Sequence, residues 1–444
     1  MRGAIAAGHP LTAEAGARVL RDGGNAVDAL LAAAFTAFVT EGPLTGPAGG
    51  GFALVHEPGG ATAMLDCFFG VPTGTLGEME ELVIDFGDAG TQVFHVGEGS
   101  VAVPGLLAGL EEVHGRFATR DWGELVEPAV ALAKKGYVRD EPRVTLHRIL
   151  AGILLRDDGG RRIYGDEARV RTEDAIATLE RVRDAGAGMV TELLPEYADD
   201  LRAYRVNVPQ PLEGEILGRR VLATPAPSLG GEIVLAILRM LEAGADSSLD
   251  DEARAVALAY GEHAHGPLPG TTHVSVVDET GMAAALSSTL GSGSGVFRGG
   301  TQLNNMLGEL DVIGLHAKAS GDRLASMMTP TLALRSGRAE LVIGSAGSVR
   351  LAGAIAQVAW RILRWDTHVS EAIRAPRIHA DGSTLHLEGG WADDAARRLG
   401  SSWDVVRWGA LNLFFGGVQA VQCSGDVFEA AGDPRRGGSG LVVP

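Results

Sequence analysis

Cysteine is almost absent from this sequence: the 444 residues include only Cys67 and Cys423. These two form no motif with metal-ligand spacing, which excludes a disulfide scaffold and a structural zinc site, so we expect no metal. Positive charge is also scarce, because 38 Lys and Arg residues stand against 56 Asp and Glu residues and leave a net charge of −18. Since no basic block occurs anywhere, we expect neither a nucleic-acid partner nor an anionic membrane partner.

A long hydrophobic run is missing as well. The longest run, residues 26–39, contains Asp28 and is shorter than the roughly 20 residues that a membrane-spanning helix requires. The apolar stretch at the N-terminus is interrupted early by His9 and Pro10, which argues against a secretory signal peptide. We therefore expect a cytoplasmic protein in which residues 26–39 form a buried helix.

Glycine, in contrast, is abundant. The sequence contains 63 glycines, about twice the number expected from a usual share of roughly 7%. Glycine permits positive φ angles and close backbone approach, so this excess predicts tight turns and backbone-lined sites, although GC-rich coding would produce the same excess. The length favours either two lobes or one large layered domain.

Capping residues and hydrophobic periodicity divide the first part of the chain into helices and strands. A helix from about Leu11 ends at a Gly-Gly stop at 23–24, and Asn25 caps a second helix that is apolar on nearly every side. The later segments, in chain order, are predicted as a strand pair within 49–67, helices within 104–137, mixed helices over 140–215, a strand from 219, a helix from about 231, and a helix within 246–270.

Residues 271–278 and 282–290 are predicted to form a β-hairpin, because 271–278 alternates in polarity and an apolar segment follows it closely. Three residues connect the two segments, and such a loop needs a left-handed residue at its end, which Gly281 supplies. Residues whose numbers sum to 560 then face each other, within one residue of slippage. On this count Thr271 lies opposite Thr289.

The stretch that opens this hairpin, TTHVSVVDETG, resembles the beginning of the small subunit of γ-glutamyltranspeptidases. Each further landmark is short, but the ordered set runs from residue 9 to residue 379 and covers most of the chain. The landmarks follow the family's order: HPLTAEAGARVLRDGGNAVDA, GPAGGGF, VAVPGLLAGL, WGELVEPAVALAKKGY, TPAPSLGG, LNN, SMMTPT, GSAGS and APRIH.

The resemblance implies an α+β fold, the four-layer αββα sandwich of N-terminal nucleophile hydrolases. It also implies a precursor that cleaves itself between Gly270 and Thr271. The two products, residues 1–270 and 271–444, would stay together as one structural domain, each the partner of the other. Whether this pair associates further stays open.

Thr271 would then supply both the nucleophile and the base. A threonine hydroxyl needs a base, and cleavage releases an α-amino group on the same residue, with a reference pKa of about 7.7–8.0. Gly270 offers an unhindered backbone for the intramolecular attack. The resemblance gives Thr289 a supporting role beside Thr271. It makes the backbone N–H groups of Gly347 and Ser348 the oxyanion donors, with serine in place of the second glycine.

The residues that hold the γ-glutamyl group in typical family members are mostly different here. Phe68 stands where an arginine is expected, and phenylalanine cannot clamp a carboxylate. We therefore expect a more apolar pocket and a small-molecule substrate other than ordinary glutathione. At the other substrate-binding positions, this chain has Gly291 where the family has an asparagine, Met306 where it has a glutamine, and Glu309 where it has an aspartate. Of the family's pair of serines, the first is retained as Ser326 and the second is replaced by Met327.

Neighbouring residues are given structural roles. Strand alternation points His273 away from the side of Thr272, so we expect a structural hydrogen bond for the histidine, and Thr272 is also taken as structural. The glycine-rich segments 291–300 and 49–52 lack the full pattern of a phosphate-binding loop. We interpret them as site-forming loops and expect no cofactor.

Three functions fit these residues. The first is an acyl hydrolase or acyltransferase acting on an amide whose acyl part is not free γ-glutamate, as in the acylases of this wider family that act on β-lactam precursors. The second follows relatives associated with alkyl-proline units of antibiotics, in which the threonine attacks a keto carbonyl and breaks a C–C bond to release an oxalyl-type group. The third is a processed homologue that only binds a ligand.

Overall fold

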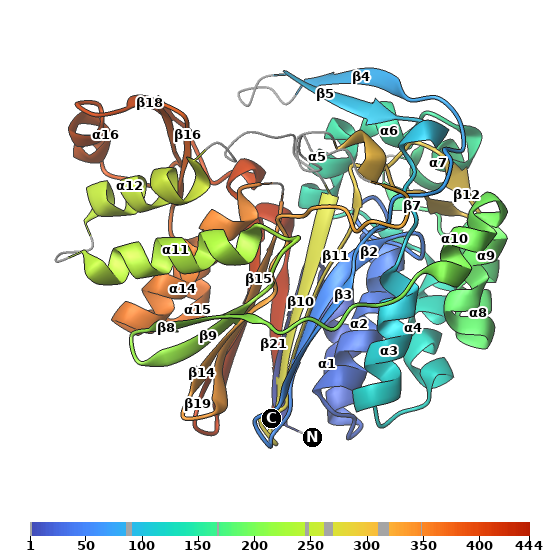
Figure 1. Cartoon of the computed structure of the whole chain (residues 1–444), viewed down its shortest axis with the longest axis horizontal. Helices are drawn as coiled ribbons and strands as arrows, with labels where there is room; N and C mark the ends of the chain where they lie inside the picture. Colours follow the sequence, from blue (N-terminus) through green and yellow to red (C-terminus); the bar gives the residue numbers. More distant parts are fainter. Residues whose placement is uncertain are drawn as a thin grey trace.

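Two six-stranded antiparallel β-sheets face each other at the centre of the molecule (Figure 1). The computed structural model describes residues 2–85, 91–166, 168–244, 248–261, 270–309, 319–347 and 349–444. The first sheet contains, in spatial order, β21 (Ser439–Val443), β1 (Gly3–Ala7), β10 (Gly270–Asp278), β11 (Ala283–Gly291), β2 (Gly50–His56) and β3 (Thr62–Cys67). The second contains β20 (Val427–Gly432), β19 (Gly417–Ser424), β15 (Arg338–Ala346), β14 (Thr331–Arg335), β9 (Arg219–Ala223) and β8 (Leu212–Ile216).

Helices cover the outer face of each sheet and complete the predicted αββα sandwich (Figure 1). The first sheet is covered by α1 (Pro10–Arg21), α2 (Ala26–Thr40) and α3 (Leu106–Phe117), with α4 (Trp122–Lys135) and α8 (Ile176–Ala185) packed outside them. The second is covered by α11 (Gly230–Ala243), α14 (Leu351–Trp365) and α15 (Val369–Arg374), with α12 (Leu249–Tyr260) packed on α11.

Smaller elements surround this sandwich (Figure 1). They are the hairpin β4 (Glu80–Asp85) and β5 (Thr91–Val96), the helices α5 (Glu141–Ile149), α6 (Ala151–Leu154), α7 (Asp158–Tyr164), α9 (Val190–Leu193), α10 (Ala198–Ala203) and α16 (Asp393–Leu399), and the short strands β6 (Tyr137–Val138), β7 (Arg169–Val170), β12 (Phe297–Arg298), β13 (Thr301–Gln302), β16 (Ile378–Asp381), β17 (Thr384–Leu387) and β18 (Asp404–Arg407).

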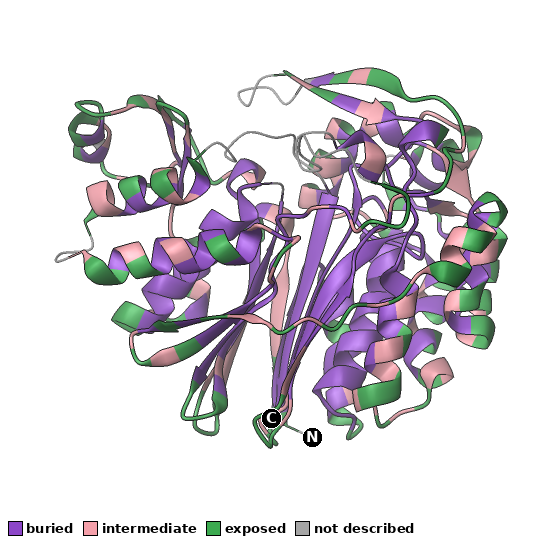
Figure 2. Cartoon of the chain, viewed as in Figure 1, coloured by how far each residue is buried: buried purple, intermediate pink, exposed green. Residues whose placement is uncertain are grey.

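The predicted buried helix is α2. The Asn25 side chain accepts a hydrogen bond from the Asp28 backbone, the Asp28 side chain accepts one from the Asn25 backbone, and every residue of the helix is buried. The helix ends at Thr40, and Glu41 is its C-cap residue. Figure 2 shows that the central strands are buried, including β1, β2, β10 and β11 in full, whereas the helices are exposed on their outer faces. Among the described residues, no helix is long and apolar enough to cross a membrane.

The β10–β11 hairpin positions the site, and its predicted register is confirmed. Thr271 lies opposite Thr289, and the pairing continues to Val277 opposite Ala283. Gly281 has φ +88°, the left-handed conformation that the turn requires. Because successive side chains alternate between the faces of a strand, Thr271 and Thr289 share the inner face of the first sheet, directed toward the second sheet.

Candidate active site

Thr271 lies at the end of the central strand β10, buried with 3% exposure. The Thr289 hydroxyl donates a hydrogen bond to the carbonyl oxygen of Gly270. The same hydroxyl accepts a hydrogen bond of 2.8 Å from the Gly291 N–H, which directs its proton toward the carbonyl. The Gly270–Thr271 peptide thus has a polarising donor on its carbonyl and a threonine hydroxyl directly after it.

An aromatic ring lies beside this pair and was not predicted from the sequence. The register of β11 with β2 places Gly50 opposite Thr289, on the same face of the sheet. A side chain on Gly50 would come within 2.7 Å of the Phe69 ring, so this ring covers the space above Gly50. Phe69, rather than its neighbour Phe68, is therefore the aromatic residue next to Thr289.

Phe52, Phe68 and Phe69 form one aromatic wall, in which Phe68 lies further from the threonines than Phe69. The Phe68 ring stacks on Phe52 at 5.3 Å between centroids and meets Phe69 edge-on at 4.9 Å. Met306 and Met327 join these phenylalanines in one buried hydrophobic cluster. Phe68, Met306 and Met327 are thus all buried in the hydrophobic core that includes the space between the two sheets.

Gly291, Met306 and Glu309 meet immediately after Thr289. Gly291 has φ +68°, and a side chain there would lie 2.2 Å from the Asn305 Oδ1, 3.1 Å from the Met306 Sδ and 3.1 Å from a Glu309 carboxylate oxygen. The Asn305 amide thus fills the space that a side chain at 291 would take. The buried Glu309 carboxylate accepts hydrogen bonds from the Ser292 N–H at 3.0 Å and from the Ser292 hydroxyl at 2.6 Å.

Ser326 lies on the loop before β14, among residues of the second sheet. Its hydroxyl accepts a hydrogen bond from the Met328 N–H at 3.0 Å, and its carbonyl accepts one from the Leu229 N–H at 2.9 Å. Among the described residues, none of the hydrogen bonds of Ser326 reaches Thr271 or Thr289.

The predicted oxyanion loop follows directly after β15. Ala346, the last residue of this strand, lines the same cavity as Thr271, and Gly347 follows with φ +114°. A side chain at Gly347 would lie 3.2 Å from the Gly416 Cα, so only glycine fits without displacing the backbone. The two facing sheets thus bring Gly347 close to Thr271. Ser348, the second predicted donor, lies outside the described residues.

Thr272 and His273 have the structural roles expected of them. The Thr272 hydroxyl donates to a carboxylate oxygen of Glu41 at 2.6 Å, on the outer face of the first sheet. His273 lies on the inner face, with its ring nitrogens 2.8 Å from the Ser287 hydroxyl and 2.9 Å from the Ser275 hydroxyl. Burial lowers the pKa of His273 to about 3, so the ring is neutral.

Burial also raises the pKa of the Glu41 carboxyl, against the opposing charge of Arg143 and the hydrogen bonds from Thr272 and Thr12. The part of the chain that is described contains no group of three or more His, Cys, Asp or Glu side chains suited to hold a metal.

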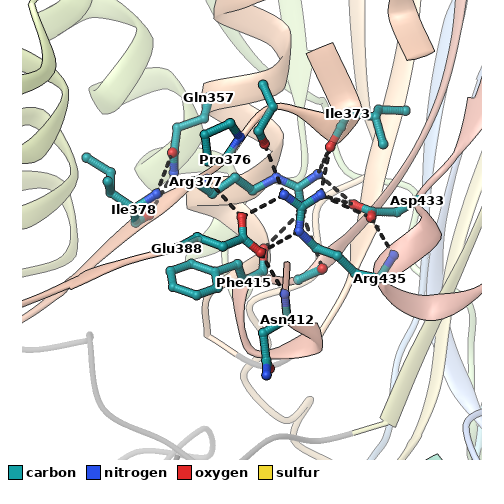
Figure 3. Close-up of polar contacts among 12 residues, drawn as sticks. Gln357, Ile373, Pro376, Arg377, Ile378, Glu388, Asn412, Phe415, Asp433 and Arg435 are labelled. Carbon is teal, nitrogen blue, oxygen red and sulfur yellow. Dashed lines mark hydrogen bonds and ion pairs between the residues drawn. The ribbon is translucent and has the colours of Figure 1, made fainter. Parts of the chain in front are cut away.

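A buried ion network joins Arg377, Glu388, Asp433 and Arg435 (Figure 3). Arg377 donates to Asp433 at 2.6 Å and to the Phe415 carbonyl at 3.0 Å. Arg435 donates to both carboxylate oxygens of Glu388, at 2.7 and 2.6 Å, and lies 3.2 Å from Asp433. The four side chains are charge-balanced and at most 1% exposed. They hold residues 415–417 and the loop around residue 436 against Gly347.

These features define a class of protein. An αββα sandwich with a threonine at the end of a central strand, beside a second hydroxyl and a glycine turn, is the arrangement of N-terminal nucleophile hydrolases. A solved structure of cephalosporin acylase from Bacillus halodurans superposes with a TM-score of 0.83 at 20% identity, covering 99% of this chain and 95% of the acylase chain. This likeness establishes the shared fold.

The chain belongs to the Gamma-glutamyltranspeptidase family, whose profile matches residues 12–178 and 247–443. It is 26% identical to the acylase ACY 1 proenzyme of a Pseudomonas species, over 90% of this chain and 86% of that protein. It is 27% identical to the glutathione hydrolase proenzyme of Pseudomonas aeruginosa, over 99% of this chain and 94% of that protein. It is 25% identical to the glutathione hydrolase proenzyme of Bacillus subtilis, over 99% of this chain and 91% of that protein.

Proposed function

We propose that this chain is a precursor that cleaves itself between Gly270 and Thr271. The Thr271 Oγ attacks the carbonyl carbon of Gly270, the C–N bond breaks, and the proton of the hydroxyl passes to the released nitrogen. Water then hydrolyses the resulting ester and leaves a free α-amino group on Thr271. The hydrogen bond from Thr289 to the Gly270 carbonyl carries this proposal, because negative charge develops on that oxygen during the attack. The related proteins named above as proenzymes support it.

The processed protein would then act as an acyl hydrolase or acyltransferase. The α-amino group of Thr271 takes the proton of its own hydroxyl as the Oγ adds to a substrate carbonyl, and it returns the proton to the leaving group. The N–H groups of the loop at Gly347 stabilise the oxyanion. Water, or an acceptor amine, then releases the acyl group from Thr271.

The acyl part of the substrate is proposed to be apolar rather than γ-glutamyl. The wall beside Thr289 consists of Phe69, Phe68 and Phe52, and the phenyl ring at position 68 cannot bind a substrate carboxylate as an arginine would. The hydrogen bonds that Glu309 accepts from Ser292 occupy one of its carboxylate oxygens. Related proteins are named both acylase and glutathione hydrolase at nearly equal identity, so the wall is what favours an acylase.

A denaturing gel and two anilides test this function. The purified chain should run as two fragments, residues 1–270 and 271–444, whereas Thr271→Ala should run as one intact band. The processed protein should release 4-nitroaniline faster from phenylacetyl-4-nitroanilide than from γ-glutamyl-4-nitroanilide. A single band for the unmodified chain would refute self-cleavage, and a preference for the γ-glutamyl anilide would refute the apolar acyl site.

The aromatic wall also favours a second candidate, a C–C hydrolase of an antibiotic pathway. The Thr271 Oγ would add to a keto carbonyl, and the adjacent C–C bond would break. A conjugated carbon leaving group, which stacks well on phenylalanine, would then take up the proton. Mass spectrometry of Thr271 after mixing with an oxalyl-substituted conjugated acid would detect the oxalyl ester; absence of both adduct and oxalate would exclude this chemistry.

A further inference from the structure

A small cavity, lined by both polar and apolar residues, opens on the side of Thr271 opposite the aromatic wall. The wall lies toward β11 and β2, whereas this cavity lies toward β1, the other neighbour of β10 in the sheet. It has a volume of about 20 Å³, enough for one water-sized group. Its lining is polar at Thr271, Glu41, Arg143, Gln419, Arg435 and Arg436, and mostly apolar at Gly8, Leu44, Pro142, Leu146, Ala346 and Leu413.

Gln419 is the first side chain in this cavity without a partner. It is fully buried, and neither its amide nitrogen nor its amide oxygen forms a hydrogen bond with any described residue. Its strand position opposite Gly344 directs it toward the first sheet, where the His273 ring occupies the space above Gly344. A buried amide without partners costs free energy unless a ligand or water satisfies it.

Arg436 is the second side chain in this cavity with a polar atom that lacks a partner among the described residues. Its guanidinium has one hydrogen bond, to the Leu413 carbonyl at 3.4 Å, and no salt bridge to any described residue. One of its nitrogens lies 3.1 Å from the position that a side chain at Gly347 would take. Burial lowers the pKa of Arg436 to about 10, so it is still charged at neutral pH. The positive end of this side chain therefore lies beside the predicted oxyanion loop.

The other charges around the cavity already have partners. Arg435 is paired with Glu388 and Asp433, and Arg143 lies 3.2 Å from a carboxylate oxygen of Asp140. Glu41 accepts hydrogen bonds from Thr272 and Thr12. Of the charged groups described in this lining, Arg436 alone has neither a counter-ion within salt-bridge distance nor a full set of hydrogen bonds.

We propose that Arg436 and Gln419 form an anion subsite that binds a carboxylate on the leaving group of the substrate. This inference rests on the proposed function, in which the acyl part occupies the aromatic side of Thr271, so the leaving group extends toward β1. One carboxylate oxygen enters between the Gln419 amide and the Arg436 guanidinium, both of which are hydrogen-bond donors. The apolar rim at Leu146, Leu413 and Pro142 packs against the rest of the leaving group. The substrate class is thus an N-acyl amine whose amine half carries an acid.

Binding of the leaving group alone tests the subsite without requiring catalysis. Isothermal titration calorimetry would compare 5-amino-2-nitrobenzoate with 4-nitroaniline, which lacks the carboxylate, using the full protein as purified. The carboxylate compound should bind at least tenfold more tightly. Arg436→Gln should abolish this preference, Arg436→Lys should retain part of it, and Gln419→Leu should reduce it. Arg364→Gln, which changes an exposed arginine far from the cavity, should leave it unaltered.

Kinetics then separate this inference from the proposed function. The ratio of kcat/KM for 6-nitro-3-(phenylacetamido)benzoate to that for phenylacetyl-4-nitroanilide should exceed ten and fall toward one in Arg436→Gln. A binding preference that depends on Arg436, without turnover of either anilide, would support the subsite and refute the acylase. Turnover of both anilides with equal binding of the two amines, or an unchanged preference in Arg436→Gln with a normal melting temperature, would refute the subsite.

Discussion

Replacing Thr289 by valine should slow self-cleavage by a factor of about 10² to 10³. The Thr289 hydroxyl donates to the Gly270 carbonyl oxygen, on which negative charge develops when Thr271 attacks. Loss of one donor to such an oxyanion typically raises the barrier by about 2.7–4 kcal/mol, which gives this factor. Valine keeps nearly the same shape, so the lost hydroxyl is the main change, and it removes both this donor and the acceptor of the Gly291 N–H.

The assay is the time course of precursor disappearance on a denaturing gel after rapid purification. Thr289→Ser keeps the hydroxyl and should cleave within a few-fold of the natural chain. Thr62→Val removes a hydroxyl at the far end of β3, 2.8 Å from a His56 ring nitrogen, and controls for loss of a hydroxyl in this sheet. Cleavage of Thr289→Val within threefold of the natural rate would refute the assignment of this hydroxyl to the developing oxyanion.

Three further results are expected. Asp433→Asn should destabilise the fold by about 3–5 kcal/mol, because Arg377 and Arg435 would then share one buried carboxylate; a lower urea midpoint would report this, and Asp199→Asn, at an exposed ion pair, should leave it unchanged. His273 has a folded pKa of about 3, below its ordinary value of 6.5, so its contribution to stability is present above pH 6.5 and is lost as the pH falls toward 3. Acidification from pH 7 to 5 should remove about 2 kcal/mol through this residue, and His273→Asn should show a correspondingly shallower pH dependence. The two cleavage fragments should co-elute in size-exclusion chromatography and separate only in denaturant; separation in native buffer would contradict the strand order.

The local part of the site could be predicted from the sequence because local rules determine it. The loop length and Gly281 fix the turn, and the period of two along a strand then fixes which residues face each other. Those rules placed Thr271 opposite Thr289, and the observed register agrees. The cap at Asn25 follows in the same way from local backbone hydrogen bonding.

The remainder of the site depends on packing between segments that are distant in the sequence. Such packing leaves no periodic pattern in the sequence from which it could be predicted. Phe69 lies over Gly50 because neighbouring strands of the first sheet meet there, and the resemblance drew attention to Phe68 alone. Gln419 and Arg436 approach Thr271 only because the second sheet packs on the first. The space at Gly291 is similarly filled by Asn305, which lies in a different loop.

Both sides of the proposed cleavage site contribute to both sheets. In the first sheet, β1, β2 and β3 precede Gly270, whereas β10, β11 and β21 follow it, and β10 pairs with β1 while β11 pairs with β2. In the second sheet, β8 and β9 precede the bond and the other four strands follow it. Cutting one peptide therefore leaves the strand pairing intact and frees only the new chain ends. After the proposed cleavage, the amino group of Thr271 would stay between the aromatic wall, which comes from the first fragment, and the pair Gln419 and Arg436, which comes from the second. Cleavage can thus create the base of the reaction in a site that the fold has already assembled.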